Sequence, residues 1–163
     1  MKLTQEPLSF RQVLPSALTI LALGSLLSLF VSSWYWLAGL GWLVIPYGLL
    51  LGLAIYLLGF ILSCSWYTRT ASMQDLLNTL HQLFRNFTWP QIIVVSILAG
   101  VGEELLIRAV LQTFLVNTAG PLWGIAVASL IFGLLHFMTK PYVLLTFALG
   151  FLFGLAFHFT GSI

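Results

Sequence analysis

The sequence predicts an all-α, polytopic integral membrane protein that forms a single transmembrane domain over residues 1–163. Three observations lead to this fold class: hydrophobic residues make up 60% of the chain, charged residues make up only 6%, and several apolar runs are long. A soluble domain carries roughly 25% charged residues, which cover its surface. A transmembrane helix needs about 20 consecutive apolar residues. The composition therefore excludes a water-soluble globular fold.

Five apolar runs predict the spanning helices, at about 13–32, 40–62, 90–116, 121–138 and 141–159. The first run is longer than the roughly 7–15 apolar residues of a signal peptide, so we expect an uncleaved helix there. Pro46 should kink the second span. In the same span, Gly48 and Gly52 have the small-x-x-x-small spacing that permits close helix contact, although glycine is also simply common in membrane helices.

The segment between the second and third spans, residues 63–89, is the one extended polar part of the chain. Leucine and phenylalanine recur in it at helical spacing, which predicts an amphipathic helix over about 73–87 with Ser72 as its N-cap. A helix of this kind lies along the membrane surface. Pro90 then suits the first turn of the third span.

The basic residues predict how the chain is oriented. Lys and Arg accumulate in the cytoplasmic loops of membrane proteins. With five spans, the five cations outside the spans all fall on one side of the membrane: Lys2, Arg11, Arg69, Arg85 and Lys140. We therefore expect a cytoplasmic N-terminus in a multi-pass protein, located in the cell membrane if the protein is bacterial. The net charge of +2 is too small and scattered for nucleic-acid binding, which needs clustered basic residues, and the expected surroundings are a lipid bilayer.

Three of the ten charged residues lie inside the third apolar run: Glu103, Glu104 and Arg108. A charged group at membrane depth costs a few kcal/mol, so it is a functional-site hypothesis by default. Glu104 and Arg108 are at i,i+4 and can form an ion pair, which is one structural explanation. That pair leaves Glu103 without a partner, and an uncompensated carboxylate in a membrane is either protonated or used. The pattern therefore favours a site in which Arg108 holds one acid while the other works.

His136 is expected at the same depth as this acidic pair. Glu104 and His136 are each 16 residues from Gly120, where the third and fourth spans should form a hairpin. At 1.5 Å per residue both lie about 24 Å from that turn, nearer the cytoplasmic side of a hydrocarbon core about 30 Å thick. Carboxylates and an imidazole at one depth can activate water, with glutamate as general base and imidazole as acid, oxyanion partner or metal ligand.

The pattern Glu103-Glu104-x-x-x-Arg108 followed by Phe132-x-x-x-His136 resembles the first two motifs of the CPBP family. That intramembrane group contains the CAAX prenyl endoproteases and the bacteriocin-processing, Abi-type proteins. The resemblance covers about residues 90–163. It implies an intramembrane endopeptidase that hydrolyses a peptide bond with a glutamate- and histidine-activated water in a site recessed in the bilayer. The implied substrate is a peptide or protein, of which a prenylated peptide and a leader peptide are two examples.

The resemblance also assigns roles to Glu103, Glu104, Arg108 and His136 as catalytic residues. Glu103 and Glu104 would orient or deprotonate the water, Arg108 would position a glutamate, and His136 would bind a metal or assist the oxyanion. In the metalloprotease form, Glu103, Glu104 and His136 would hold a divalent metal such as zinc. A metal-free mechanism is the other form of the same prediction, since a usual catalytic zinc site has three protein ligands plus water.

The third motif of the family, H-x-x-x-N or H-x-x-x-D on a further helix, is not matched in these residues. His158 is not a convincing substitute, because Ser162 stands four residues later and His158 should lie at the outer end of the fifth span. Two other functions therefore stay open. One is a non-catalytic membrane immunity or assembly factor on the same fold. The other is a small proton-coupled transporter, since buried acids also serve as proton relays.

Overall fold

The structure is a computed structural model that describes residues 8–31, 44–63 and 70–161. These residues are largely helical and contain no strand, which confirms the all-α class. The elements are α1 (Phe10–Val31), α2 (Val44–Ser63), α3 (Ala71–Phe84), α4 (Trp89–Glu104), the π-helix η4 (Leu105–Gln112), α5 (Thr113–Ala119), α6 (Pro121–Leu135) and α7 (Lys140–Thr160).

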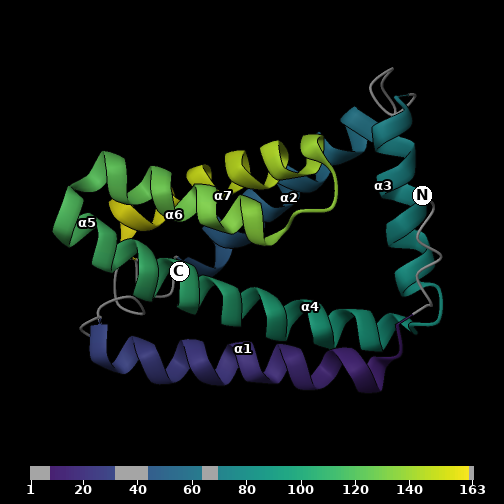
Figure 1. The fold of residues 1–163 in the computed structure, drawn as a ribbon, viewed down its shortest axis with the longest axis horizontal. Coiled ribbons are helices and arrows are strands. Elements are labelled where there is room, and N and C mark those ends of the chain that lie inside the picture. Colours follow the sequence, from purple (N-terminus) through teal and green to yellow (C-terminus); the bar gives the residue numbers. More distant parts are fainter. Residues whose placement is uncertain (1–7, 32–43, 64–69, 162–163) are drawn as a thin grey trace.

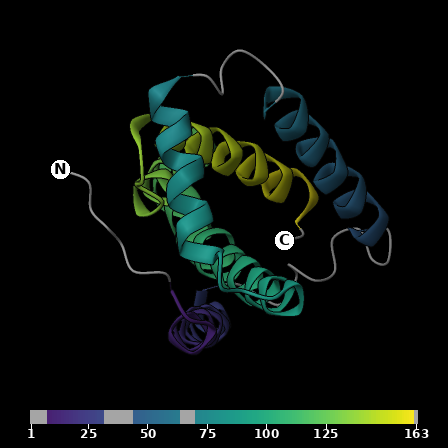
Figure 2. The same cartoon turned by 90° about the vertical axis from the view of Figure 1, so that its right-hand side faces the viewer.

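The helices that carry the predicted site residues belong to two packed layers, which Figure 1 shows edge-on. α1 runs beside α4 and η4 in one layer, and the α6–α7 hairpin forms the other. α5 and the turn at Gly120 connect the layers at one end; Gly120 has a φ of 84°, which glycine adopts without a steric penalty. α3 crosses the opposite end, as Figure 2 also shows. Residues of α4, η4 and α6 that point inward therefore meet between the layers.

Glycines allow the closest helix contacts, but not the two glycines of the second predicted span. Around Gly48 and Gly52, no atom lies within 4 Å of the position that a Cβ would take. The close contact that their spacing permits is therefore not formed with the described residues, and the other explanation, that glycine is common in membrane helices, is the one that agrees with the structure. In contrast, a Cβ at Gly102 would lie 2.7 Å from the backbone nitrogen of Leu21, and a Cβ at Gly24 would lie 2.8 Å from the carbonyl oxygen of Gly102. The backbones of α1 and α4 thus touch directly beside Glu103.

The α6–α7 hairpin is packed in the same way. A Cβ at Gly133 would lie 3.0 Å from the carbonyl oxygen of Val143, and a Cβ at Gly150 would lie 3.1 Å from the ring of Phe132. Small residues that let backbones approach are the usual means of helix association in membranes. The hairpin therefore fixes the position of α6, the helix that carries Phe132 and leads to His136.

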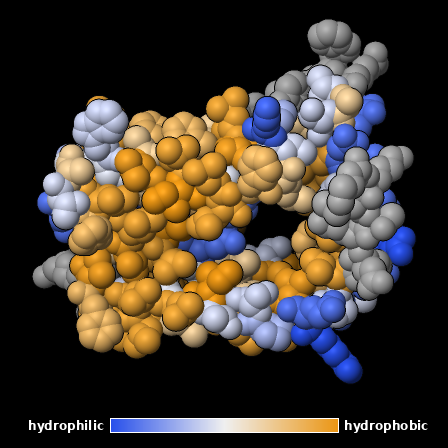
Figure 3. Space-filling model, in the orientation of Figure 1, coloured by the Kyte–Doolittle hydropathy of each residue, from blue (hydrophilic) through white to orange (hydrophobic). Residues whose placement is uncertain are grey.

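Large apolar side chains cover most of the outer surface, as Figure 3 shows for one face. They are exposed on several long helices, among them Leu26 and Phe30 of α1, Leu49, Leu50 and Tyr56 of α2, and Leu144 and Leu152 of α7. Exposed apolar surface of this extent marks a membrane contact or another interaction surface. By length and composition, two of the described helices, Phe10–Val31 and Lys140–Thr160, could cross a membrane. The predicted total of five spans stays a prediction.

The described part of α2 covers Val44–Ser63, and Pro46 lies near its beginning. Residues 40–43 of the predicted span lie outside the described residues. The predicted kink at Pro46 therefore stays a prediction.

The amphipathic helix also starts earlier than predicted. Thr70, with extended backbone angles (φ −70°, ψ 140°), precedes α3 as its N-cap, and the Thr70 carbonyl accepts hydrogen bonds from the backbone N–H groups of Met73 and Gln74. Ser72 is consequently already inside the first turn. The predicted N-cap is wrong because Ser and Thr are both favoured N-cap residues, and the backbone angles decide which of the two takes that position.

One end of the bundle collects the described basic residues other than Arg108. Arg11 is in the first turn of α1, Arg85 is the C-cap of α3 and Lys140 begins α7. In Figure 1 these three element ends lie on the same side, opposite the α5–α6 turn. The ring of Phe87 packs on both Phe84 and Phe10, with centroid distances of 5.3 and 6.2 Å. The predicted topology requires Arg11, Arg85 and Lys140 to lie at one end of the bundle, as they do here. The orientation in the membrane stays a prediction.

Candidate active site

The charged residues of the third apolar run lie where the helix changes its winding. α4 ends at Glu104, η4 follows, and an α-helix resumes at Thr113. The backbone N–H of Thr113 reaches the carbonyl of Arg108, five residues earlier, and the Thr113 hydroxyl donates to the same oxygen at 3.1 Å. π-helical turns are rare and frequently occur at functional sites. A wider helical turn therefore presents Arg108 and Gln112 to the neighbouring helices.

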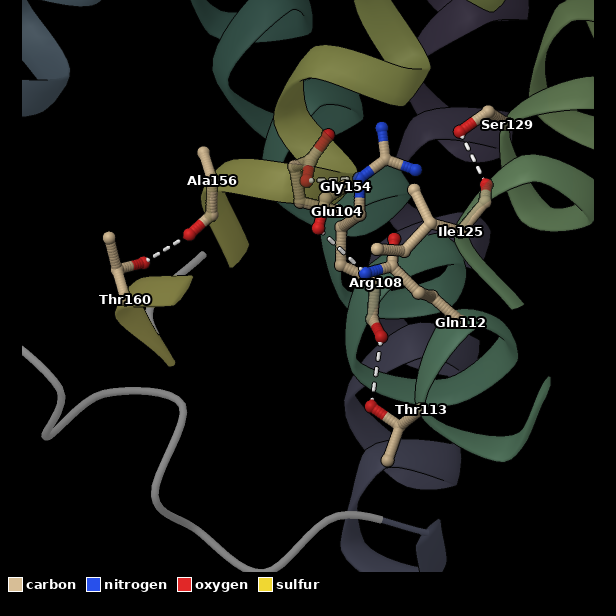
Figure 4. A network of polar contacts seen from close by, with 9 residues as sticks. All are labelled: Glu104, Arg108, Gln112, Thr113, Ile125, Ser129, Gly154, Ala156 and Thr160. Carbon is tan, nitrogen blue, oxygen red and sulfur yellow. Dashed lines mark hydrogen bonds and ion pairs between the residues drawn. The ribbon is translucent and has the colours of Figure 1, made fainter. Parts of the chain in front are cut away.

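Glu104 and Arg108 form the ion pair that their i,i+4 spacing predicts. The Arg108 Nε lies 3.3 Å from Glu104 Oε2, as the dashed line in Figure 4 marks. The Arg108 side chain is fully buried, whereas that of Glu104 is 30% exposed. The guanidinium also lies over the ring of Phe132, with its Cζ 5.3 Å from the ring centroid. Arg108 is thus enclosed between a carboxylate of its own helix and an aromatic ring of α6.

Glu103 meets His136. Its Oε2 lies 3.7 Å from the His136 Nε2, and the two side chains are 32% and 28% exposed. The depth argument from the sequence compared Glu104 with His136, but the helical turn directs Glu103, not Glu104, toward the imidazole. The structure therefore brings all four predicted residues together as two pairs. One pair, Glu104–Arg108, contains a fully buried cation, and both members of the other pair, Glu103–His136, are partly exposed.

His136 lies just beyond α6 instead of inside it. α6 ends at Leu135, and His136 has non-helical backbone angles (φ −95°, ψ 23°), so the predicted end of this span at residue 138 is too late. The imidazole turns back onto the last helical turn, where its Nδ1 lies 2.9 Å from the carbonyl oxygen of Phe132. Because a carbonyl only accepts hydrogen bonds, Nδ1 must carry the proton. In the neutral imidazole, the lone pair of Nε2 then faces the Glu103 carboxylate.

A hollow lies between the two layers of the fold (Figure 3). Figure 3 shows an opening between the layer of α1 and α4 and the layer of α6 and α7, with hydrophilic surface at its edge inside an otherwise apolar face. A concave, mostly apolar site with a few convergent polar groups is the usual form of a ligand or active site. Glu103 and His136, each about one-third exposed, are the polar groups that a substrate could reach.

The predicted metal ligands do not converge on one point. Among the residues that the structure describes, no group of three or more His, Cys, Asp or Glu side chains could hold a metal ion. Glu104 is engaged by Arg108, which leaves Glu103 and His136 as the available donors, whereas catalytic zinc usually has three protein ligands. The donor set present here does not fit zinc. The metal-dependent form therefore stays a prediction, and the two available donors are considered for a metal-free reaction.

Gln112 is a buried polar residue of the site region that the sequence pattern does not single out. Its side chain is 1% exposed, and its Nε2 donates to the carbonyl oxygen of Gly154 in α7 at 2.8 Å. A Cβ at Gly154 would lie 2.7 Å from the Gln112 Oε1. Gln112 therefore ties η4 to α7. The signal that could have identified it is a second polar side chain in the same apolar run, four residues after Arg108.

His158, the histidine not expected at the site, lies in the last turn of α7. It is exposed, and its ring packs edge-on against Phe159 with a centroid distance of 5.4 Å. His136 lies beside the start of the same helix. Since a helix of this length extends about 30 Å, the two histidines belong to opposite ends of α7.

Comparison with known proteins agrees with the motifs. Residues 85–163 match the family described as "Type II CAAX prenyl endopeptidase Rce1-like". The chain is also 35% identical over 86 residues to the uncharacterized protein YpbD of Bacillus subtilis (strain 168), a match that covers 50% of this chain and 41% of YpbD. The chain thus spans less than half the length of that relative. No solved structure matches the chain.

The matched region contains every predicted site residue. It begins at the end of α3 and includes α4, η4, α6 and α7, which together form the Glu104–Arg108 and Glu103–His136 pairs. The two motifs, their juxtaposition in space and the family match lead to one assignment. Residues 85–163 of this chain match the Rce1-like family of type II CAAX prenyl endopeptidases, a family of membrane-embedded proteases.

Proposed function

We propose that this protein is an intramembrane endopeptidase of the CPBP/CAAX-protease type in which Glu103 and His136 activate the attacking water. The observation that carries the proposal is the distance of 3.7 Å between Glu103 Oε2 and His136 Nε2. Both atoms belong to partly exposed side chains, and the two residues come from different elements. An acid and an imidazole in this arrangement can share one water molecule.

The proton on His136 Nδ1 decides how that water is held. With Nδ1–H bound to the Phe132 carbonyl, a neutral imidazole offers only an acceptor at Nε2. A water molecule can then donate one hydrogen bond to His136 Nε2 and the other to the Glu103 carboxylate. Assistance of an oxyanion, the other predicted role of His136, would require the doubly protonated imidazolium.

The reaction follows from this placement of the water. Glu103 accepts a proton as the water oxygen bonds to the scissile carbonyl carbon, which gives a tetrahedral intermediate and a neutral Glu103 carboxyl. Glu103 then donates that proton to the departing amide nitrogen as the C–N bond breaks. The products are a carboxylic acid and an amine, and Glu103 returns to its ionised form. General acid–base catalysis of this kind contributes about 10²–10⁴-fold to a rate.

Glu104 and Arg108 have a supporting role in this mechanism. The buried guanidinium holds the Glu104 carboxylate at 3.3 Å, so Glu104 is engaged while its neighbour stays available for the water. Because Glu103 and Glu104 are adjacent, fixing the orientation of one also limits the movement of the helical turn that carries the other. In the proposed mechanism Arg108 therefore positions the base and does not touch the substrate.

The substrate in this proposal is a peptide or protein presented at the membrane, prenylated or carrying a leader peptide. The family match supports a peptide substrate, and the apolar surface around the opening supports delivery from the bilayer. We further propose that the protein is multi-pass with a cytoplasmic N-terminus, since Arg11, Arg85 and Lys140 gather at one end of the bundle.

The test uses the full chain in proteoliposomes with a fluorescence-quenched peptide that ends in a farnesylated CAAX sequence. We expect cleavage by the wild type, and a loss of at least 100-fold in kcat for Glu103→Gln and for His136→Ala because the water loses one of its acceptors. Asp75→Asn and His158→Ala are the matched controls, since both replace exposed residues outside the site. Both controls should cleave at the wild-type rate.

A second readout does not depend on the choice of peptide. Membranes of cells that express the wild type, Glu103→Gln or His136→Ala are compared for newly formed protein N-termini. N-termini present only with the wild type support hydrolysis. If Glu103→Gln, Glu104→Gln and His136→Ala all retain cleavage, the proposal is rejected. A cellular phenotype that survives all three substitutions would instead support the non-catalytic immunity or assembly factor.

A further inference from the structure

We propose that Phe132 is a positioning residue that couples the two pairs of the site, because it contacts Arg108 with its ring and His136 with both its ring and its carbonyl. The inference rests on the proposed hydrolysis and adds to it the residue that sets the relative positions of the two pairs. Phe132 lies in the last full turn of α6, between η4 and the start of α7.

The contact with Arg108 is a cation–π interaction. The guanidinium Cζ lies 5.3 Å from the Phe132 ring centroid, inside the range of about 6 Å over which such interactions occur. The Arg108 side chain is fully buried, and within the described residues its terminal nitrogens, Nη1 and Nη2, have no hydrogen-bond partner. The Glu104 carboxylate and the Phe132 ring are therefore the two groups described here that hold this cation in place.

The contact with His136 uses both parts of Phe132. The two ring centroids are 4.4 Å apart at an interplanar angle of 49°, and the Phe132 carbonyl holds the imidazole Nδ1 at 2.9 Å. The ring limits the tilt of the imidazole, while the carbonyl fixes which nitrogen carries the proton. Together they direct Nε2 toward Glu103, in the way that a partner on the second nitrogen orients functional histidines in general.

Packing against α7 fixes the position of the Phe132 ring. A Cβ at Gly150 would lie 3.1 Å from the Phe132 Cδ1, so the ring occupies the space that the absent side chain leaves on α7. Glu104 and Arg108 come from α4 and η4, whereas His136 follows α6. A ring held against α7 and in contact with both Arg108 and His136 therefore transmits any shift of α6 to both pairs.

The electronic character of the ring provides a test that separates positioning from simple packing. Phe132 is replaced by phenylalanine with one, two and then three ring fluorines, which keep the shape closely but progressively weaken the negative face that attracts a cation. We expect kcat to fall stepwise, by about tenfold over the series, with KM unchanged. The same series at Phe151, whose ring packs on Phe147 at 6.3 Å, is the matched control and should leave kcat constant.

A second variant approaches the ring without changing it. In Gly150→Ala the new methyl group would press on the ring, so kcat should fall although no site side chain is altered. Gly100→Ala is its control, because no atom lies within 4 Å of that Cβ position. In Phe132→Leu, which loses the ring, the Arg108 Nε–H proton should also lose its ring-current shift in the NMR spectrum, a result that requires no substrate.

The outcomes distinguish this inference from the proposed function. If the wild type shows no cleavage that depends on Glu103, the proposed function is rejected, and the role of Phe132 in that reaction is rejected with it. If the wild type cleaves but the fluorinated series leaves kcat constant, the inference alone is overturned and Phe132 only fills space. An Arg108 Nε–H resonance that does not move in Phe132→Leu would likewise overturn it.

Discussion

Glu103 and Glu104 are neighbours in sequence with different partners in space. Successive residues of an α-helix are rotated by about 100°. The Glu104 carboxylate therefore reaches Arg108 one turn along the helix, whereas the Glu103 carboxylate reaches His136 at the end of α6, in the other layer. Their surroundings differ accordingly: the partner of Glu104 is fully buried, and the partner of Glu103 is 28% exposed. The two residues should therefore respond differently to the same substitution.

Glu104→Gln should destabilise the protein more than Glu103→Gln does. Removing the Glu104 charge leaves the buried guanidinium without its counter-ion, which costs about 3 kcal/mol for a buried pair. Glu103 and His136 are partly exposed, so Glu103→Gln should change the free energy of unfolding by less than about 1 kcal/mol. Reversible unfolding in mixed micelles measures both values. Equal destabilisation by the two variants would contradict the assignment of Arg108 to Glu104.

Among the helices, α1 has a role that the family match does not cover. It lies outside residues 85–163, yet it packs along both α4 and η4. The contact is closest at Gly24 and Gly102, where the two backbones leave no room for a Cβ. Because Gly102 immediately precedes Glu103, α1 supports the turn that carries the proposed base.

Gly102→Ala should therefore lower both stability and activity. Its Cβ would lie 2.7 Å from the backbone nitrogen of Leu21, and since backbone cannot move aside easily, we expect a loss of about 1–3 kcal/mol, as for an overpacked core. Gly100→Ala, in the same helix but with open space around it, should be neutral or slightly stabilising. Thermal unfolding and cleavage rates of both variants test this, and equal behaviour would refute the close α1–α4 contact.

For the whole molecule, the gathering of basic residues at one end predicts the side from which the chain can be labelled. Cys64 is the sole cysteine of the sequence and follows α2 directly, on the side predicted to be cytoplasmic. A membrane-impermeant maleimide should therefore react with Cys64 in inside-out vesicles but not in intact cells. A Cys64→Ser, Ala119→Cys variant, with the cysteine at the α5–α6 turn, should show the reverse. Labelling of both positions from one side would exclude the predicted topology.

The residue types and their spacing determined much of this protein. A chain with so few charged residues cannot cover itself with polar surface, so the helical fold and the expected membrane environment followed from the apolar runs. The Glu104–Arg108 pair followed from i,i+4 spacing, because residues one helical turn apart lie on the same face. The placement of His136 near the acidic pair followed from the hairpin at Gly120, since equal distances from a turn mean equal depth.

Tertiary structure decided which atoms meet. The winding of η4, the end of α6 at Leu135 and the glycine contacts all depend on how neighbouring backbones fit, and helix spacing alone does not contain that information. For this reason the sequence could not show that Glu103 faces His136, that Gln112 binds α7, or that Phe132 contacts both Arg108 and His136. The residues of the site could be identified from the sequence, but their contact partners depend on tertiary packing.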